Sequence, residues 1–112
     1  MPIFVSQGRY SREAVRGMTQ NPEDRTEPVA KLIQQAGGRL LSYYVTFGDT
    51  DWLVIAEMPN EKAMAAVVLA VAGGGGVTDV RTTLALTAAE AKGAFGMASD
   101  LARSFRTAGQ AG

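Results

Sequence analysis

The stretch GGRLLSYYVTFGDTDWLVIAE, residues 37–57, decides the fold of this chain. Its two apolar runs, 39–47 and 52–57, flank the short polar segment 48–51, which is the pattern of two strands joined by a turn. A strand with one solvent-exposed face alternates apolar and polar residues, whereas these runs are apolar almost throughout. We therefore expect both faces of the hairpin to be covered, one by the chain's own helices and the other by a second copy of the chain.

The flanking segments predict two more strands and three helices before the C-terminal region. Residues 2–10 and 77–86 are typical of strands, and helices are expected at 11–18, from Asn21 or Thr26 to residue 36, and at 60–72. Asn21 is followed by a proline and two acids, which favours a start there, but Pro28 would then kink the helix, so a start at Thr26 is the alternative. All three helices lie between strands, two before the hairpin and one after it. With the main helix of each connection counted, the order is β-α-β-β-α-β. This is an α+β, ferredoxin-like split arrangement, with a four-stranded antiparallel sheet and two helices on one face.

A C-terminal helix follows the last strand. Thr87 and Glu90 have the spacing of a capping box, and the helix is expected to run to about Phe105. Phe95, Leu101 and Phe105 share one seam with several alanines, and we expect this seam to pack against protein, in this subunit or in a neighbouring one. The prediction is one domain over residues 1–107 and a frayed tail at 108–112.

Composition excludes several classes of function. The 112 residues include 11 basic and 11 acidic side chains, so the chain lacks the positive excess of a nucleic-acid-binding protein. Cysteine and histidine are both absent, which removes disulfides, thiolate chemistry and the commonest metal ligands. We therefore expect no metal and no cofactor.

Hydropathy gives no sign of a membrane protein. The longest apolar run, 63–72, is far shorter than the roughly 20 residues that cross a bilayer, and no signal peptide is recognisable. We expect a cytoplasmic protein with no membrane or nucleic-acid partner.

Five residues near the central turn are candidates for a ligand site. Asp51 directly precedes an apolar strand, so its carboxylate could anchor a ligand, although aspartate also shapes turns. Tyr43 and Tyr44 must face opposite sides of the sheet, and Trp52 lies close to them in sequence. Their rings could stack on a ligand or simply pack in the core or an interface. Arg81 completes the set, in the middle of the last strand.

Two interpretations of Arg81 remain open. An arginine among apolar neighbours needs a partner, and Asp51, Glu57 or Asp79 could form an ion pair with it. The alternative is that its guanidinium group binds an anionic ligand.

These segments together resemble the GYD domain family of small bacterial and archaeal proteins. The resemblance covers nearly the whole chain, and its motifs are Gly8-Arg9-Tyr10, Gly37-Gly38, Tyr44–Gly48, Asp51–Ile55 and Val80–Leu84. Gly48 and Asp51 hold the glycine and acid positions of the name-giving motif. Thr50 stands at the tyrosine position, so no role for a phenol is implied there. The resemblance implies a dimeric α/β barrel and no particular reaction.

Three functions are compatible with these observations. The first is a homo-oligomeric barrel that binds a small, partly apolar molecule between sheet and helices. The second is a cofactor-free oxygenase or isomerase that relies on Asp51, Tyr43 or Tyr44, and Arg81, an idea based on fold-level analogy. The third is a structural or interaction module without a ligand.

Overall fold

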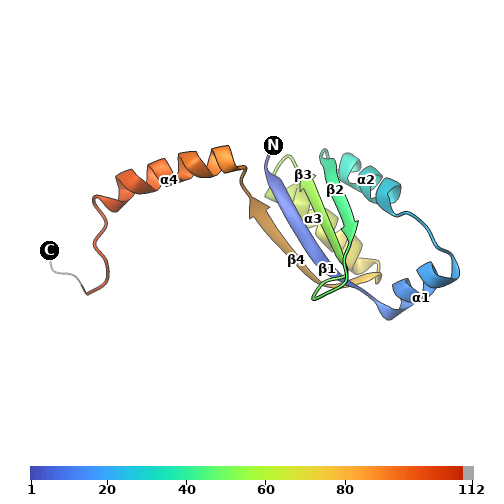
Figure 1. The fold of residues 1–112 in the computed structure, drawn as a ribbon. Coiled ribbons are helices and arrows are strands. Elements are labelled where there is room, and N and C mark those ends of the chain that lie inside the picture. Colours follow the sequence, from blue (N-terminus) through green and yellow to red (C-terminus); the bar gives the residue numbers. More distant parts are fainter. Residues whose placement is uncertain (110–112) are drawn as a thin grey trace.

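The structure of the chain is a computed structural model that describes residues 1–109. It is an α+β fold built from four strands and four helices (Figure 1). In chain order the elements are β1 (Ile3–Tyr10), α1 (Arg12–Gln20), α2 (Thr26–Gln35), β2 (Arg39–Val45), β3 (Trp52–Glu57), α3 (Glu61–Gly73), β4 (Val77–Ala85) and α4 (Ala88–Ala102).

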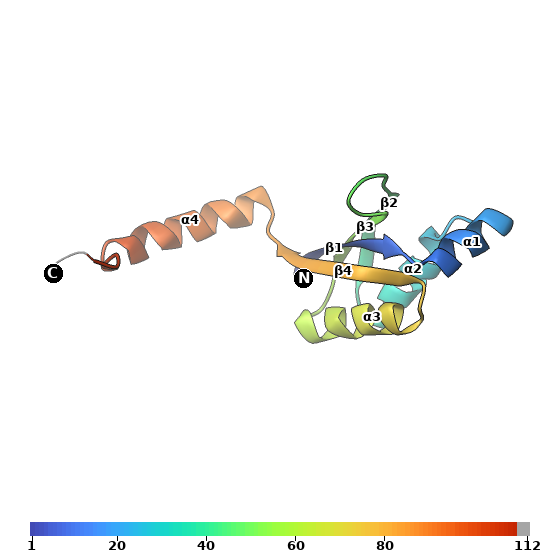
Figure 2. The same cartoon turned by 90° about the horizontal axis from the view of Figure 1, so that it is seen from below.

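The four strands form one antiparallel sheet in the order β2-β3-β1-β4. Helices α2 and α3 lie on one face of this sheet, as Figure 2 shows, and α1 lies beyond its end. The predicted α+β class and the four-stranded antiparallel sheet are therefore confirmed. The face turned away from α2 and α3 is called the open face below.

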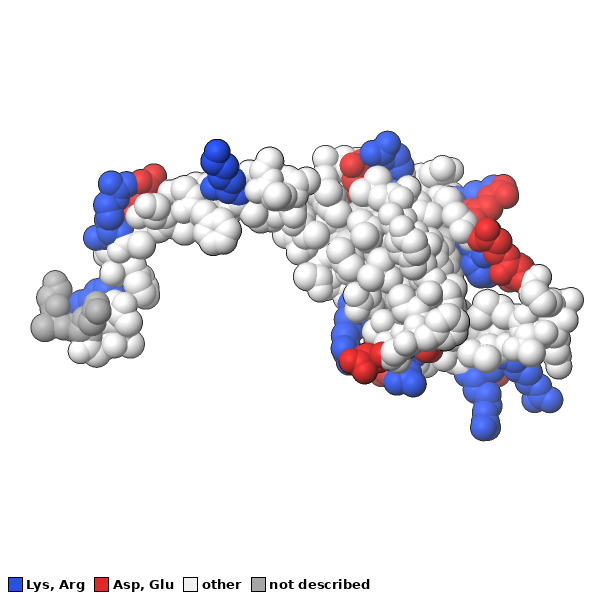
Figure 3. Space-filling view, in the orientation of Figure 1, with Lys and Arg blue, Asp and Glu red and all other residues white. Residues whose placement is uncertain are grey.

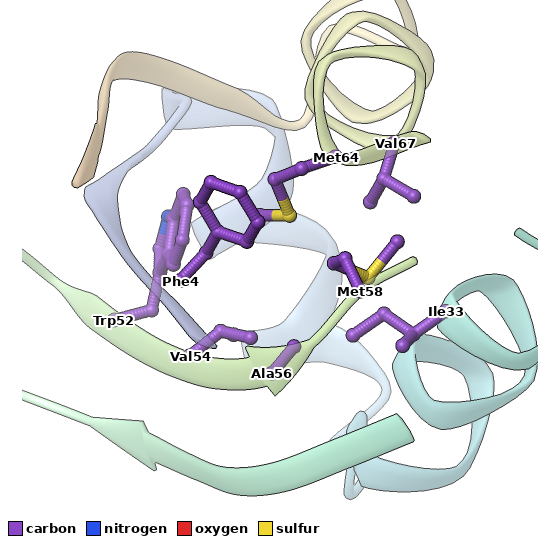
Figure 4. Close-up of a cluster of buried hydrophobic side chains, with 8 residues drawn as sticks. All are labelled: Phe4, Ile33, Trp52, Val54, Ala56, Met58, Met64 and Val67. Atoms are coloured by element: carbon purple, nitrogen blue, oxygen red, sulfur yellow. The ribbon is translucent and has the colours of Figure 1, made fainter. Parts of the chain in front are cut away.

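The core lies between the sheet and the two helices that cover it. Alternate residues of the central strands point into it, because side chains of a strand alternate between its faces. Figure 4 shows the buried cluster, which combines residues from β1, β3, α2 and α3 with one that follows β3: Phe4, Ile33, Trp52, Val54, Ala56, Met58, Met64 and Val67. Burial alternates residue by residue along β1 and β3, although the sequence of β3 is apolar almost throughout.

Local capping chemistry explains where the helices begin. Ser11, Asn60 and Thr87 each accept a hydrogen bond from a backbone N–H in the first turn of α1, α3 and α4. Glu90 completes the predicted capping box of α4. Helix α2 begins at Thr26, which places Pro28 in the first turn, where a missing N–H costs nothing.

The hairpin loop is longer than the sequence predicted. Strand β2 ends at Val45 instead of continuing to Phe47, whose side chain is 97% exposed. Thr46 closes the loop, because its N–H donates to the Asp51 carbonyl at 2.8 Å and its hydroxyl donates to the Thr50 carbonyl at 2.6 Å. The first bond extends the pairing of Val45 with Trp52 by one residue. Beyond Thr46 the chain bends at 47–49, so the strand stops although the apolar run continues.

The open face is apolar in its middle. By strand alternation Ile3 and Val5 of β1 and Leu53 and Ile55 of β3 lie on it, and all four are only partly buried. Figure 3 looks onto this face, where uncharged atoms cover the middle and the charged side chains lie toward the margins.

Helix α4 projects away from the rest of the molecule, as Figures 1 and 2 show. The Cα extents are 65 × 30 × 22 Å, which reflects this projection. Phe95, Met97, Leu101 and Phe105 are each at least two-thirds exposed, at 76%, 68%, 67% and 73%. Helix α4 ends at Ala102 instead of running to about Phe105 as predicted, because the chain turns at 103–104, so Phe105 lies beyond the helix. The predicted apolar side chains are exposed, and within residues 1–109 the chain itself does not cover them.

The predicted frayed tail, 108–112, lies partly outside the described residues, since 110–112 are not described. Among residues 1–109, none of the helices has the length and apolar character needed to cross a membrane.

Candidate functional site

A cavity of about 150 Å³ lies between the sheet and helices α2 and α3. Its wall is mainly aliphatic, because both helices turn their apolar stripes toward the sheet. Val29, Leu32 and Ile33 come from α2, and α3 contributes four residues with the spacing of one helix face: Met64, Val67, Val68 and Val71. The polar side chains that line it are Ser6, Tyr10, Arg25, Tyr43 and Trp52.

Two tyrosine hydroxyls meet at this cavity. The Oη atoms of Tyr10 and Tyr43 are 2.6 Å apart and share a hydrogen bond. Tyr10 ends β1 and Tyr43 lies on β2, so the bond joins two strands that are separated by β3 in the sheet. On the same face, the Oγ of Ser6 and the Oγ1 of Thr82 share a second hydrogen bond of 3.0 Å, between β1 and β4.

The Tyr10–Tyr43 contact affects the ionisation of Tyr43. Burial raises the pKa of the Tyr43 phenol well above its ordinary value, and the hydrogen bond with Tyr10 raises it further, against a smaller opposing effect of Arg25. The Tyr43 hydroxyl is therefore harder to ionise than that of an ordinary tyrosine, and it can both donate and accept hydrogen bonds.

The indole N–H of Trp52 has no hydrogen-bond partner among the described residues, although its Nε1 atom is buried. Trp52 itself is only 6% exposed and lines the cavity. A buried donor without an acceptor is rare and costs about 1–3 kcal/mol.

The absence of a side chain at Gly8 leaves room for the indole ring of Trp52. Trp52 is paired with Gly8 across β1 and β3, and a Cβ atom on Gly8 would lie 2.5 Å from Cζ2 of the indole. Any larger residue at position 8 would therefore push the ring. The β1–β4 ladder also shifts its register between Gln7 and Arg9, next to the residue that the ring covers.

The cavity opens toward a wider surface depression of about 820 Å³ beside α1. Five residues line both spaces and so mark the entrance: Tyr10, Arg25, Leu32, Val71 and Val77. Arg25 is the charged residue at this entrance, and its guanidinium group lies 3.1 Å from the carboxylate of Glu23. Its charge is thus partly balanced and remains in contact with solvent, with 44% of the side chain exposed.

The five residues proposed from the sequence do not gather in one place. Tyr43 and Trp52 line the cavity. Tyr44 is paired with Leu53 on the open face and is 60% exposed. Arg81 is also exposed and pairs with Gln7, whose side chain alternates onto that open face.

Asp51 lies at the end of the β1–β3 ladder. Its carboxylate accepts a hydrogen bond of 2.9 Å from the N–H of Tyr10, and its own N–H donates to the Gly8 carbonyl at 2.7 Å. These contacts give Asp51 a structural role in holding the end of β1. It is not among the residues that line the cavity.

The expected ion pair of Arg81 with Asp51, Glu57 or Asp79 is not formed within residues 1–109. Glu57 instead lies 3.2 Å from Arg39, its neighbour in the ladder between β2 and β3. The physical reason is exposure, since an arginine in contact with water needs no partner.

Sequence reasoning did not propose Ser6, Tyr10 or Arg25 as site residues. A signal for the first two was present, because Phe4, Ser6, Gly8 and Tyr10 alternate on one face of the first strand. Arg25 gave no such signal, since it lies in the connection before α2. Among residues 1–109, no group of three or more acidic side chains could hold a metal ion.

Solved structures with a similar fold come from several bacteria. TTHA0845 from Thermus thermophilus matches with a TM-score of 0.52 and 17% identity, over 79% of this chain and 96% of that one. An AsnC family transcriptional regulator from Agrobacterium tumefaciens has a TM-score of 0.52 and 18% identity, over 77% of this chain. A transcriptional regulator from Neisseria meningitidis, solved as a complex with L-Met, has a TM-score of 0.50 and 19% identity, over 78% of this chain.

These likenesses concern the fold, which is ferredoxin-like. The chain spans about half the length of the two regulators, 50% and 51% respectively. No curated protein matches the sequence. The family model of the GYD domain matches residues 4–95, so the chain belongs to the GYD domain family, as its motifs predicted.

Proposed function

We propose that this member of the GYD domain family is a homo-oligomeric binding protein, which holds a small, partly apolar molecule between its sheet and its helices. The observation that carries the proposal is the cavity beside Trp52, whose buried N–H has no partner in the described protein. A mostly apolar hollow with a few polar groups is typical of small-molecule sites.

The size of the cavity suits a ligand of about one ring. An apolar cavity of similar volume, about 150 Å³, engineered in another protein binds benzene. The wider depression beside α1 leaves room for a substituent of such a ligand to extend past Arg25. The fold is compatible with this role, since the similar regulator from Neisseria meningitidis was solved with L-Met.

Binding is favoured over the oxygenase or isomerase alternative. That alternative relied on Asp51, Arg81 and a tyrosine as one catalytic set, but Asp51 and Arg81 do not line the cavity. Tyr43 does line it, but its raised pKa makes the phenol harder to ionise than that of an ordinary tyrosine.

We also propose that the chain assembles as a dimeric α/β barrel through the open face. The support is the apolar middle of that face, around Val5, Leu53 and Ile55, which a single chain leaves in contact with water. The exposed apolar side chains of α4, including Phe95 and Leu101, add a second surface that a neighbouring subunit could cover.

Ethylbenzene is a suitable first probe for the cavity, because it is apolar and contains a single ring. We expect it to raise the melting temperature by about 4 °C or more at concentrations well above its Kd. Val71 lies at the border of the cavity and the entrance, so Val71→Phe should fill the space and abolish this protection.

Leu69→Phe is the matched control, since Leu69 lies on the same helix and is 71% exposed. It should leave the protection intact. The melting temperature of each variant without ethylbenzene shows whether it folds. Protection that persists in folded Val71→Phe, or that is absent from the wild-type protein, would contradict binding in this cavity.

A further inference from the structure

We infer that helix α4 of one subunit packs in a groove between α3 and β4 of a second copy of this chain. This inference rests on the proposed homo-oligomer, because it names the surface that receives α4. Three features of the described residues lead to it: the groove itself, the apolar outer face of α3 beside it, and the direction in which α4 leaves its own subunit.

The groove lies on the helix-covered side of the sheet and has a volume of about 400 Å³. Six of the residues that line it are apolar: Phe4, Met64, Ala65, Val68, Leu69 and Val80. Leu69 is 71% exposed, and Leu84, which is 53% exposed, pairs with Phe4 and so points to the same side of the sheet. A single chain therefore leaves large apolar side chains of this region in contact with water.

Helix α3 is apolar on its outer face as well as on the face that it turns to the sheet. From Ala63 to Gly76 the sequence contains no charged or polar side chain. Five residues of the outer face are exposed: Ala65, Ala66, Leu69, Ala70 and Ala72. A helix at the surface normally has a polar outer face, whereas a helix that is apolar all round is normally buried. We therefore expect the outer face of α3 to be covered in the assembled protein.

Helix α4 has an apolar face that suits this surface. Phe95, Ala98, Leu101 and Ala102 recur at the spacing of one helix face, which is called the α4 seam below. Phe95 and Leu101 are largely exposed in the single chain. Alanines on both α3 and α4 allow the two helices to approach closely, while the larger side chains of the α4 seam can enter the groove.

The area available is sufficient for a specific contact. Phe95, Leu101 and the other exposed apolar side chains of α4 offer on the order of 500 Å² of apolar surface. Covering them removes a similar area from the receiving subunit, so one contact buries roughly 1,000 Å², which is the lower limit for a specific interface. A reciprocal exchange of α4 between two copies would double this area to about 2,000 Å², the size of a stable dimer interface.

The connection between β4 and α4 favours a second copy over docking within one chain. Leu86 and Thr87 are the two residues between these elements. Thr87 is held by both hydrogen bonds of the capping box with Glu90, and α4 then points away from α3, as Figures 1 and 2 show. Packing of α4 on its own α3 would require this short connection to reverse its direction.

Paramagnetic broadening between two differently labelled chains tests this inference. The sequence contains no cysteine, so Gly96→Cys provides a single site for a nitroxide label. Gly96 has open space around its Cα and lies on the helix face opposite Ala98, so the label does not interfere with the α4 seam. The labelled variant is mixed in urea with ¹⁵N-labelled wild-type chain, and the two are refolded together so that the copies exchange.

Any loss of intensity in the ¹⁵N spectrum then arises from a second copy. We expect the amide peaks of residues 65–70 in α3, and those of Val80 and Thr82 in β4, to lose the most intensity. Leu69→Lys in the ¹⁵N-labelled chain places a charge on the receiving surface and should abolish this loss. Gln34→Lys adds the same charge at an exposed position of α2 and should preserve it. Leu69 is largely exposed, so Leu69→Lys should still fold, which its own amide spectrum checks.

The outcomes separate this inference from the proposed assembly. Broadening confined to the open face, for example at Leu53 and Ile55, would overturn the inference and leave the open-face dimer standing. Broadening confined to α4, or present only when the label and ¹⁵N are in the same chain, would overturn it in favour of paired α4 helices or of docking within one chain. Persistence of the α3 signal loss in Leu69→Lys, or no broadening in a mixture that sediments as an oligomer, would also overturn it. If the mixture shows no broadening and sediments as a monomer, both the inference and the proposed assembly fail.

Discussion

The hydroxyl groups of Tyr10 and Tyr43 are 2.6 Å apart and connect β1 to β2 across the intervening strand β3. The pair lines the cavity, and Tyr10 also borders the entrance beside α1. This hydrogen bond therefore contributes both to the stability of the sheet and to the polar part of the cavity wall.

Removing the hydroxyl of Tyr43 should destabilise the protein modestly. Tyr43→Phe deletes a partly buried hydrogen bond, so we expect the free energy of unfolding to fall by about 1 kcal/mol. Urea denaturation followed by circular dichroism measures this change. Tyr44→Phe is the matched control, because Tyr44 is 60% exposed on the open face and makes no side-chain hydrogen bond within residues 1–109. Equal effects of the two substitutions would argue against a structural role of the pair.

The same pair predicts a loss of stability at alkaline pH. The pKa of Tyr43 is raised in the folded state, mainly by burial, so the unfolded chain releases this proton at a lower pH than the folded protein. The resulting stabilisation is fully present below about pH 10 and decreases as the pH rises above that value. Urea midpoints measured across this range should fall more steeply for the wild-type protein than for Tyr43→Phe. Parallel curves for the two proteins would refute the assignment.

Gly8 should tolerate no side chain. Gly8→Ala would place a Cβ atom 2.5 Å from Cζ2 of Trp52 and 3.1 Å from the Thr78 carbonyl oxygen. Overpacking of this kind costs roughly 1–3 kcal/mol, and the displaced indole should show an altered fluorescence spectrum. Gly48→Ala serves as the control, since a Cβ atom there meets no atom within 4 Å. An unchanged melting temperature of Gly8→Ala would show that the ring is not held as described.

The open face gives a prediction about assembly. Ile55→Lys places a charge in the middle of the apolar surface, so the proposed dimer should dissociate in sedimentation velocity experiments. Gln34→Lys adds the same charge at an exposed position of α2 and should leave the assembly unchanged. A wild-type protein that is a stable monomer at micromolar concentration would contradict the proposal at once.

Helix α4 is expected to contribute to the same assembly. A chain that ends at Thr87 lacks the exposed side chains of Phe95, Leu101 and Phe105. Because α4 packs little against its own subunit, the shortened chain should still fold, but it should sediment as a smaller species. Identical sedimentation of the shortened and full-length chains, apart from the mass removed, would show that α4 covers no neighbour.

Much of the fold could be predicted from the sequence, because its signals are local. Ser11, Asn60 and Thr87 define helix starts through their own side chains, and apolar runs identify the strands. The end of β2 was missed because Val45-Thr46-Phe47 continues the apolar run. The structure shows that the chain instead bends at 47–49, after the bonds of Thr46 to Thr50 and Asp51.

The site was harder to predict, since it depends on contacts between distant segments. Tyr43 and Trp52 were identified by proximity to the turn, but their partners Tyr10 and Gly8 come from β1. A shift of one residue in pairing exchanges the faces of Tyr43 and Tyr44, so the sequence alone left their assignment open. Arg81 and Asp51 were proposed because of their residue types. Strand register places Arg81 on the open face of the sheet, and Asp51 lies at the end of β1.

A crystal structure of the protein grown in the presence of ethylbenzene tests the central claim most directly. Our account predicts electron density for one ring inside the cavity, against Val67 and Val71 of α3. An empty or collapsed cavity, with ethylbenzene bound only on the open face or not at all, would contradict the account.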